Sequence, residues 1–377
     1  MDRSTLRRRA TPPAVVLTLA LALAACGGNA APGNTSAPQA TSGDTGGGSA
    51  ELSGTLSGAG ASSQTAAMQA WQAGFQEQNP DVTVNYDPVG SGGGREQFIA
   101  GGTVFAGSDA YLDDEELTAA EERCNGAGVV ELPHYISPIA VAYNLEGVDA
   151  LNLSPDTVAG IFSEKITAWN DPAIAKDNPD AQLPDTKITP VHRSDESGTT
   201  ENFVEYLAAA APEAWTFEVS GDWPGELGGE AASGTSGVVQ AIGAGNGTIG
   251  YADASQVGDL GSAAIGVGGE FVDYSPEAAA KVLEASERVS GRGENDIAID
   301  VARDTTESGT YPIVLVSYHI ACQQYSEQQE ADLVKAFLGY VASDEGQQAA
   351  AEAAGSAPIS PTLQEDSMAA IESITAG

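Results

Sequence analysis

Segments with a strand pattern alternate with segments with a helix pattern along most of this 377-residue chain. The strand patterns, in which apolar residues alternate or run continuously, lie at 82–90, 129–144, 187–193 and 311–321. The helix patterns, in which apolar residues recur every three or four positions, lie at 63–79, 201–210 and 327–343. Such alternation is typical of α/β folds, and the chain is longer than one compact core supports. We therefore predict an α/β protein with about two domains.

The first 26 residues have the pattern of a bacterial lipoprotein leader. Four arginines lie among the first nine residues, and the apolar run at 14–25 is too short to span a bilayer comfortably. The run ends in Leu-Ala-Ala before Cys26, which resembles the lipobox whose cysteine is lipidated. Ordinary secretion with an incidental cysteine is the alternative. We predict a signal peptide at 1–25, lipidation at Cys26, and an extracytoplasmic protein anchored to the cell membrane.

A tract of Gly, Ser, Thr, Pro and Ala follows Cys26. It has nothing to bury and predicts a flexible tether over 26–50, with the folded part starting near Glu51. No second apolar run of membrane length follows it.

The chain is strongly acidic. The leader holds four of the 15 basic residues and one of the 53 acidic ones, which leaves 11 basic against 52 acidic and a net charge of −41. This excludes nucleic acid as a natural partner, because binding it requires lysine and arginine to neutralise phosphates. Outside the cell Cys124 and Cys322 could pair or remain separate buried thiols, and we favour the disulfide.

Three Gly/Ser segments stand directly before helix patterns. They contain Ser62 and Ser63, then Ser91, then Ser197, Gly198 and Thr199. The first N–H groups of a helix lack internal partners and carry partial positive charge, so helix starts can bind anions. One such segment is more often a plain helix cap. Three of them, with the rare Arg193 beside the third, predict an anion site.

Signatures of common enzymes are absent from the sequence. It has no G-x-x-x-x-G-K-[ST] phosphate loop and no G-x-S-x-G nucleophile turn. His134, His192 and His319 are scattered without metal-ligand spacing, so we expect no metal and no cofactor. His192 near Ser197 is the least implausible pair of base and nucleophile.

Several motifs, in order, resemble those of the phosphate-binding proteins of the Pst ABC transporter. These are GAGAS at 58–62, VNYDPVGSGGGREQFIAG at 84–101, FAGSDAYL at 105–112, ITAWNDPAI at 166–174 and RSDESGTT at 193–200. Further matches are GNGTIGYADAS, YPIVLVSYHI and YVASDEGQQ, so that the resemblance extends from about Leu52 to Ile359.

The resemblance implies which residues bind phosphate. They are Ser62, Ser63, Ser91, Asp109, Arg193, Ser197, Gly198 and Thr199, with Asp195 orienting the arginine. The family usually has phenylalanine where this chain has Ser63, which keeps the backbone N–H and loses the ring. Arginine offers a planar fork to two anion oxygens.

Asp109 decides between alternative ligands. Phosphate keeps a proton that it can donate to this carboxylate, whereas sulfate has none and would leave a buried charge unpaired. A binding protein for sulfate or molybdate is one alternative function. A phosphatase on the same scaffold is the other, although no activated nucleophile or metal pair is visible.

The family also implies an architecture. We expect the two-lobed type II periplasmic-binding-protein fold, with two mixed sheets flanked by helices and the ligand cleft at the hinge. The first lobe would hold 51–138 and 311–377, which include both Cys124 and Cys322, and the second would hold 139–310. The expected partners are inorganic phosphate and the permease subunits of an ABC importer, and the protein would be a monomeric carrier rather than an enzyme.

Overall fold

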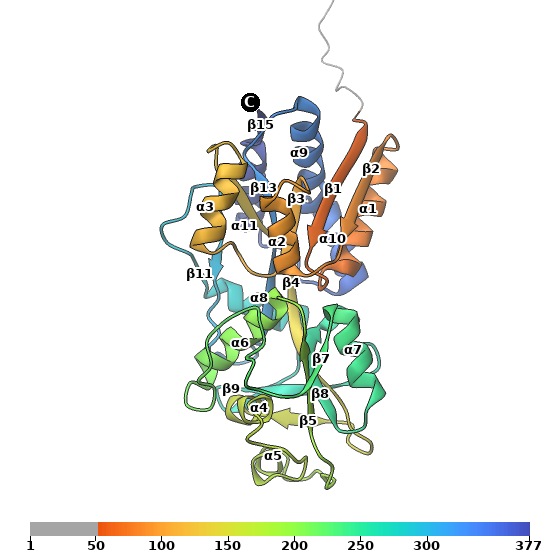
Figure 1. The fold of residues 1–377 in the computed structure, drawn as a ribbon. Coiled ribbons are helices and arrows are strands. Elements are labelled where there is room, and N and C mark those ends of the chain that lie inside the picture. The colour runs from red at the N-terminus through yellow and green to blue at the C-terminus, as the bar shows by residue number, and fades with distance from the viewer. Residues whose placement is uncertain (1–51) are drawn as a thin grey trace, which may run out of the picture. The chain divides into compact units, whose positions relative to one another are not determined.

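The computed structural model describes residues 52–377, so the predicted leader, the predicted lipidation site Cys26 and the predicted tether lie outside the described residues. The chain forms two lobes, each a sheet flanked by helices (Figure 1). The helices are α1 (Thr65–Gln78), α2 (Ser91–Ile99), α3 (Asp114–Arg123), α4 (Pro155–Phe162), α5 (Pro172–Asp177), α6 (Gly198–Ala210), α7 (Gly234–Ala244), α8 (Pro276–Glu284), α9 (Gln328–Ala342), α10 (Asp344–Ala354), α11 (Pro361–Glu372) and the 3-10 helix η1 (Ala254–Gln256). None of these helices is long and apolar enough to cross a membrane.

The described strands form mixed sheets that share one strand and, apart from these, two small two-stranded sheets. They are β1 (Gly54–Gly60), β2 (Val82–Asp87), β3 (Phe105–Ser108), β4 (Val129–Asn144), β5 (Leu151–Leu153), β6 (Thr189–Arg193), β7 (Glu230–Ala232), β8 (Thr248–Asp253), β9 (Gly261–Val267), β10 (Glu270–Val272), β11 (Glu287–Arg288), β12 (Ile299–Asp300), β13 (Val314–Cys322), β14 (Gln324–Tyr325) and β15 (Thr375–Ala376). Hydrogen bonds connect β2-β1-β3-β13-β4-β8-β6-β7 in that order, and β9 pairs with β4, β5 and β10. The neighbours of β1 and of β6 run parallel to them, whereas β13 and β4 are antiparallel.

The long strand β4 crosses from one lobe to the other. Its first part pairs with β13 up to Pro138, and its second part pairs with β8 from Ile139 onward. Fifteen of its sixteen residues are buried, which explains its continuous apolar sequence rather than an alternating one. Prolines lack the N–H that a ladder needs, and the register with β13 shifts beside Pro133. The change of partner falls between Pro138 and Ile139, where β4 passes from the sheet of the first lobe to that of the second.

The segment 287–300 differs from the predicted division of the chain. The prediction assigned it to the second lobe, but it packs on the first. The backbone N–H of Ile297 donates to the carbonyl oxygen of Glu131 at 2.9 Å. Arg292 forms ion pairs with Glu131 at 3.1 Å and with Asp296 at 3.3 Å, all three side chains being buried. This cluster of charges, which no local pattern reveals, holds the segment in place.

The disulfide between Cys124 and Cys322 lies in the first lobe. Both residues are fully buried, and their Cα atoms lie 5.4 Å apart. Cys124 follows the last residue of α3 and Cys322 ends β13, so the bond joins segments 198 residues apart in sequence. The bond therefore closes a loop that contains the second lobe.

Two of the three histidines meet in the core of the first lobe. The Nδ1 atoms of His134 and His319 lie 3.2 Å apart, and the Nε2 atom of each is buried without a hydrogen-bond partner among the described residues. Trp71 and Phe105 pack edge-on against the ring of His319. Burial lowers the pKa of His319 to about 3 and lowers that of His134 well below its usual value. Both rings are therefore neutral in the folded protein near neutral pH.

We expect the His319→Gln variant to lose less stability than the wild type when the pH falls. An unfolded histidine titrates near pH 6.5, so below that pH the unfolded chain binds a proton that folded His319 refuses. This group alone should lower the free energy of unfolding by about 1.4 kcal/mol per pH unit below pH 6.5, until the pH approaches the folded pKa. Between about pH 6.5 and 4.5 the wild type should lose roughly 2 kcal/mol more than the variant in urea unfolding.

Comparing the wild type with His319→Gln cancels the pH dependence that the buried carboxyl groups contribute, because both proteins contain them. His192→Gln is the control, because opposing contributions from the Arg193 carbonyl and Glu164 moderate the lowered pKa of that ring. Parallel stability profiles of wild type and His319→Gln would contradict the assignment of the acid sensitivity to this pair.

Candidate functional site

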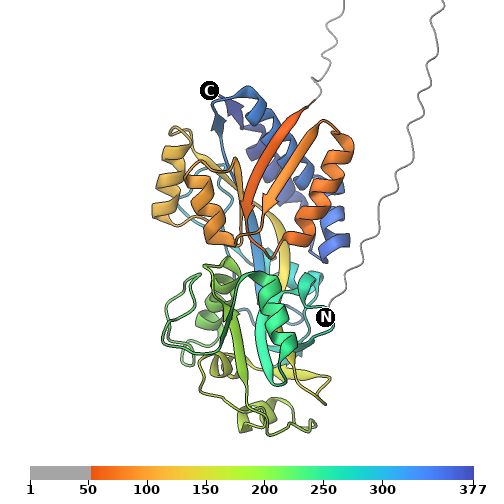
Figure 2. The same cartoon turned by 45° about the vertical axis from the view of Figure 1, so that its right-hand side comes forward.

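Four helix starts meet where the lobes face each other. α1 and α2 begin in the first lobe, and α6 and α7 begin in the second (Figures 1 and 2). The strands β1, β3 and β6 end immediately before or beside these helix starts. Ligands of open α/β sheets bind outside the carboxyl ends of the strands, so this is the position at which the topology favours a site.

Asp109 is the centre of this region and follows the last residue of β3. Its side chain is 2% exposed. The hydroxyl of Ser63 donates to both of its carboxylate oxygens, at 2.7 and 2.8 Å, and the hydroxyl of Thr199 donates to Oδ2 at 2.8 Å. The backbone N–H of Asp109 donates to Ser91 Oγ at 3.1 Å. The three predicted helix starts therefore converge on Asp109 from both lobes, two of them on its carboxylate and one on its backbone N–H.

The start of α6 approaches Asp109 so closely that a side chain would not fit. A Cβ atom added at Gly198 would lie 2.7 Å from Asp109 Cβ and 2.8 Å from Ser91 Oγ. Ser197 caps α6, because its Oγ accepts from Thr200 N at 3.3 Å. Glycine is required here by close approach, which is what lets the backbone of α6 line the site.

Arg193 lies at the end of β6 and is 3% exposed. Its Nε donates to Asp195 Oδ1 at 2.9 Å and its Nη2 pairs with Asp195 Oδ2. Asp195 also accepts from the N–H of Gly234 at 3.0 Å. Burial opposes the charge on Asp195, but the hydrogen bonds and charge of Arg193 outweigh it and lower the pKa of Asp195. Asp195 therefore holds the guanidinium in one orientation, at the start of α2 beside Gly90.

The loop that contains Ser62 and Ser63 is held by hydrogen bonds from residues that the sequence patterns did not reveal. Ser62 Oγ accepts from Thr235 N at 3.1 Å and lies 3.1 Å from the Thr235 hydroxyl. Gln256 Nε2 donates to the carbonyl oxygens of Ser62 and Ser63, both at 2.9 Å. Thr235 belongs to a Gly-Thr-Ser-Gly helix start, which resembles the three Gly/Ser helix starts noted in the sequence. That pattern could have identified Thr235 as a fourth candidate. Gln256 had no local signal, since its partners lie more than 190 residues away.

Asn202 is a further residue that the sequence analysis missed. Its Nδ2 donates to the carbonyl oxygens of Asp109 and Gly198, both at 2.7 Å. The side chain lies on the buried face of α6 and bridges the two lobes at the site. Its oxygen accepts from Arg303, which also pairs with Glu205 at 2.8 Å.

A second buried arginine, Arg95, lies near the site but is committed to protein partners. Its Nε binds Glu116 at 2.8 Å, its Nη1 donates to Ser108 Oγ at 3.0 Å, and its Nη2 binds Glu196 at 3.0 Å. The pair with Glu196 spans the two lobes. Two buried arginines, Arg193 and Arg95, therefore lie near Asp109. Arg95 donates to Ser108, the residue before Asp109, and its other nitrogens are paired with Glu116 and Glu196.

The pair of His192 and Ser197 is not assembled as a base and a nucleophile. The ring of His192 stacks on Trp223 at 4.9 Å, and its Nδ1 lies 2.8 Å from the carbonyl oxygen of Arg193. No hydrogen bond joins His192 to Ser197 among the described residues, and the Ser197 oxygen serves the helix cap. Within residues 52–377 no group of three or more His, Cys, Asp or Glu side chains is arranged to hold a metal ion.

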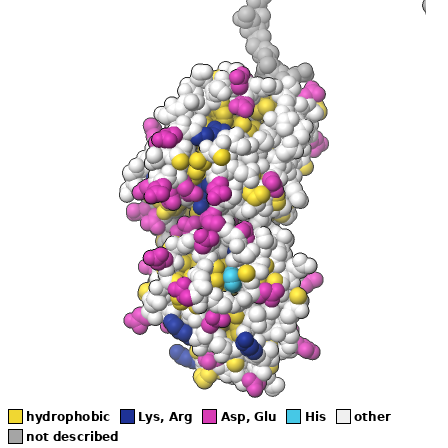
Figure 3. Space-filling model, viewed as in Figure 1, with side chains coloured by type: hydrophobic (Ala, Val, Ile, Leu, Met, Phe, Trp, Pro, Cys, Tyr) yellow, Lys and Arg dark blue, Asp and Glu magenta, His cyan; other side chains and the backbone are white. Residues whose placement is uncertain are grey.

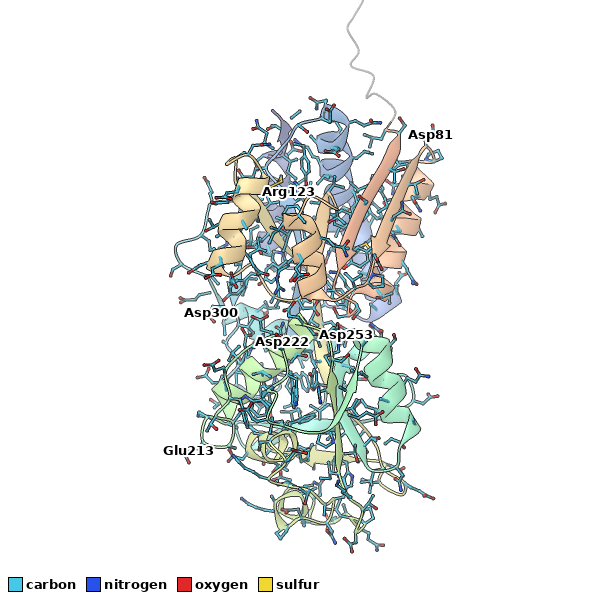
Figure 4. All side chains as sticks on the ribbon, in the orientation of Figure 1. Asp81, Arg123, Glu213, Asp222, Asp253 and Asp300 are labelled. Atoms are coloured by element: carbon cyan, nitrogen blue, oxygen red, sulfur yellow. A yellow bond between two sulfur atoms is a disulfide. The ribbon has the colours of Figure 1, made fainter. Side chains whose placement is uncertain are left out.

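The region around Asp109 contains a second buried acid, Asp253. Burial raises the pKa of Asp109, opposed by the hydroxyls of Ser63 and Thr199 and by Arg193. Burial also raises the pKa of Asp253 to about 6, and Asp253 lies where β4 passes between the lobes (Figure 4). On the surface, acidic side chains are scattered over both lobes of the visible face (Figure 3). The region around Asp109 is thus a small group of hydrogen-bond donors inside an acidic protein.

Comparison with known proteins identifies the family. A model of the PBP superfamily domain matches residues 36–345. The phosphate-binding protein PstS3 of Mycobacterium bovis is 40% identical over 290 residues, 75% of this chain and 77% of that protein. The phosphate-binding protein PstS2 of the same organism is 35% identical over 367 residues, 94% of this chain and 95% of that protein.

Solved structures share the fold. A high-affinity periplasmic phosphate-binding protein (PfluDING), solved with phosphate bound, superposes with a TM-score of 0.70 at 23% identity, over 84% of this chain and 93% of that one. A putative phosphate ABC transporter substrate-binding protein of Clostridium perfringens gives a TM-score of 0.58 at 20% identity, over 81% and 100% of the two chains. The expected two-lobed periplasmic-binding-protein fold is confirmed, and the chain belongs to the PBP superfamily and, within it, to the PstS family of phosphate-binding proteins.

Proposed function

We propose that this protein captures inorganic phosphate outside the cytoplasm and delivers it to the permease of an ABC importer. The observation that carries the proposal is that one arginine, Arg193, oriented by Asp195, and one carboxylate, Asp109, are both buried in the same region among helix starts. An anion that still carries a proton satisfies both groups. Family membership supports the same ligand, since the relatives are phosphate-binding proteins.

The hydroxyl groups of the site have protons to donate. Ser91 Oγ accepts from Asp109 N and Ser197 Oγ accepts from Thr200 N, and neither hydroxyl donates to another described residue. Each can therefore donate its proton to an anion oxygen. Neutral donors of this kind, together with helix starts and one guanidinium, bind an anion without a metal ion.

The proposed role is binding and delivery rather than catalysis. The protein would act as a monomer, held at the membrane by lipid on Cys26. Calorimetric titration of the purified, ligand-stripped protein with phosphate, sulfate and arsenate tests the ligand. Saturable phosphate binding with no heat from sulfate supports the proposal, and absence of phosphate binding by folded protein refutes it. Sustained phosphate release from a chromogenic phosphomonoester would instead favour a phosphatase.

Asp109→Asn is expected to reduce selectivity more than it reduces phosphate binding. The amide keeps a carbonyl acceptor but removes the negative charge that would repel sulfate. A buried unpaired charge costs on the order of 1–3 kcal/mol or more, so the ratio of phosphate to sulfate affinity should fall at least about fivefold. Competition titrations measure this ratio. A ratio at the wild-type value would mean that Asp109 does not detect the ligand proton.

Cys26→Ser is expected to release the protein from the membrane fraction while phosphate affinity stays unchanged. A single acyl chain anchors a protein only marginally, so stable attachment would require more than one. Fractionation of cells that express each form measures the distribution. Retention of the serine variant in the membrane fraction would contradict lipidation at this residue.

A further inference from the structure

The hydroxyl of Ser63 has a contact that its position in the first loop does not predict. The family resemblance assigned only the backbone N–H of this residue to the ligand. In the structure the side chain is fully buried and its hydroxyl contacts both oxygens of Asp109, at 2.7 and 2.8 Å. A hydroxyl has one proton, so this proton is shared between the two carboxylate oxygens.

Asp109 needs donors because burial works against its charge. A carboxylate removed from water is driven toward its neutral form, and each hydrogen bond donated to it favours the ionised form. Burial raises the pKa of Asp109, and the hydroxyl of Ser63 is the largest of the influences that lower it, followed by those of Thr199 and Ser317. Ser63 is therefore the main neutral support of the charge.

Charged and titratable groups face Asp109 from three other strands. Arg193 at the end of β6 favours the carboxylate. Asp253 at the end of β8 is buried, and the charge of Asp109 contributes to its raised pKa. Tyr86 on β2 has a strongly raised pKa, caused first by burial and then by Asp109, and stays neutral. Within residues 52–377, the cation that favours the charge of Asp109 is Arg193, and it is already paired with Asp195, which increases the importance of the hydroxyl donors.

We propose that Ser63 is a specificity-determining residue, whose hydroxyl keeps Asp109 ionised and thereby maintains the discrimination between phosphate and sulfate. This inference rests on the proposed function. An ionised Asp109 accepts the proton of phosphate and repels sulfate. A protonated Asp109 is itself a donor, which suits the fully ionised oxygens of sulfate and no longer accepts a proton from phosphate.

The experiment compares Ser63→Ala with the wild type at about pH 8 and about pH 5.5 by competition calorimetry with phosphate and sulfate. Each comparison is made at one pH, so the protonation of phosphate itself cancels. Near pH 8 the two proteins should have similar ratios of phosphate to sulfate affinity. Near pH 5.5 the ratio should be lower in the variant than in the wild type, by at most about tenfold for each unit by which the pKa of Asp109 rises.

Two further variants separate this role from a structural one. Thr65→Ala removes a hydroxyl that donates to the Ser62 carbonyl in the same loop at 2.7 Å but does not touch Asp109, and it should keep the wild-type ratio at both pH values. In an Asp109→Asn background, Ser63→Ala should no longer change the ratio, because there is no carboxylate to support.

The outcomes are distinguishable. A wild type that binds phosphate and rejects sulfate, with a Ser63→Ala variant of unchanged ratio at both pH values, overturns the inference and leaves the proposed function intact. A fall in the ratio that is equal in the Asp109→Asn background also overturns it, because Ser63 would then act on the shape of the loop. A wild type that binds no phosphate refutes the proposed function itself.

Discussion

Arg193→Ala is expected to weaken phosphate binding by about 2–5 kcal/mol, roughly thirtyfold to several thousandfold, while the protein stays folded. Arg193 is 3% exposed and is paired with Asp195. Its removal deletes the charged donor of the site and also leaves the carboxylate of Asp195 without its cation. The variant would then present an unpaired negative charge to an anion, so the effect should exceed that of losing one neutral hydrogen bond.

Calorimetry with phosphate measures the change, and thermal unfolding verifies the fold. Arg288→Ala is the matched control, because Arg288 forms an ion pair with Asp366 on the surface, with about half of both side chains exposed. Exposed pairs contribute little, so the control should bind phosphate as the wild type does. A well-folded Arg193→Ala variant with an unchanged dissociation constant would remove Arg193 from the site.

Replacing Cys124 and Cys322 together by alanine is expected to lower the free energy of unfolding by roughly 5 kcal/mol. The bond joins residues 198 apart, and the chain-entropy model gives about 5 kcal/mol for closing a loop of that length in the unfolded chain. Two buried sulfur atoms are also lost from a packed core. The expected effect is therefore at the upper end of what native disulfides contribute.

Denaturant unfolding of the oxidised and the doubly substituted proteins measures this difference. Both proteins should carry Cys26→Ser, which prevents exchange with a third thiol. Phosphate affinity of the folded variant should be unchanged, because the disulfide lies between α3 and the end of β13, away from Asp109. A loss below about 1 kcal/mol would mean that the unfolded chain is already compact in this region.

The sequence by itself determined the class of fold and indicated residues that the structure brings together around Asp109. Strand and helix periodicities, together with Gly/Ser helix starts, depend on residues that are close together in the sequence, so they can be recognised without a structure. The segment 129–144 had the continuous apolar sequence of a buried strand, and it forms β4. The motifs around Ser91, Asp109 and Arg193 indicated the family, and these residues lie together in one buried region. Their roles toward phosphate stay predictions.

Tertiary structure alone decided which residues support that site. The partners of Gln256 lie more than 190 residues away, and Arg95 reaches Glu196 across 101 residues. The same is true of the hydroxyl of Ser63, whose sequence position indicated only its backbone N–H, and of the segment 287–300, which packs on the first lobe through Glu131. A local sequence pattern predicts only the contacts that a residue makes with its neighbours along the chain. Which buried donor meets which buried acceptor depends on how distant segments pack, and the requirement that buried polar groups be paired is satisfied only in the folded chain.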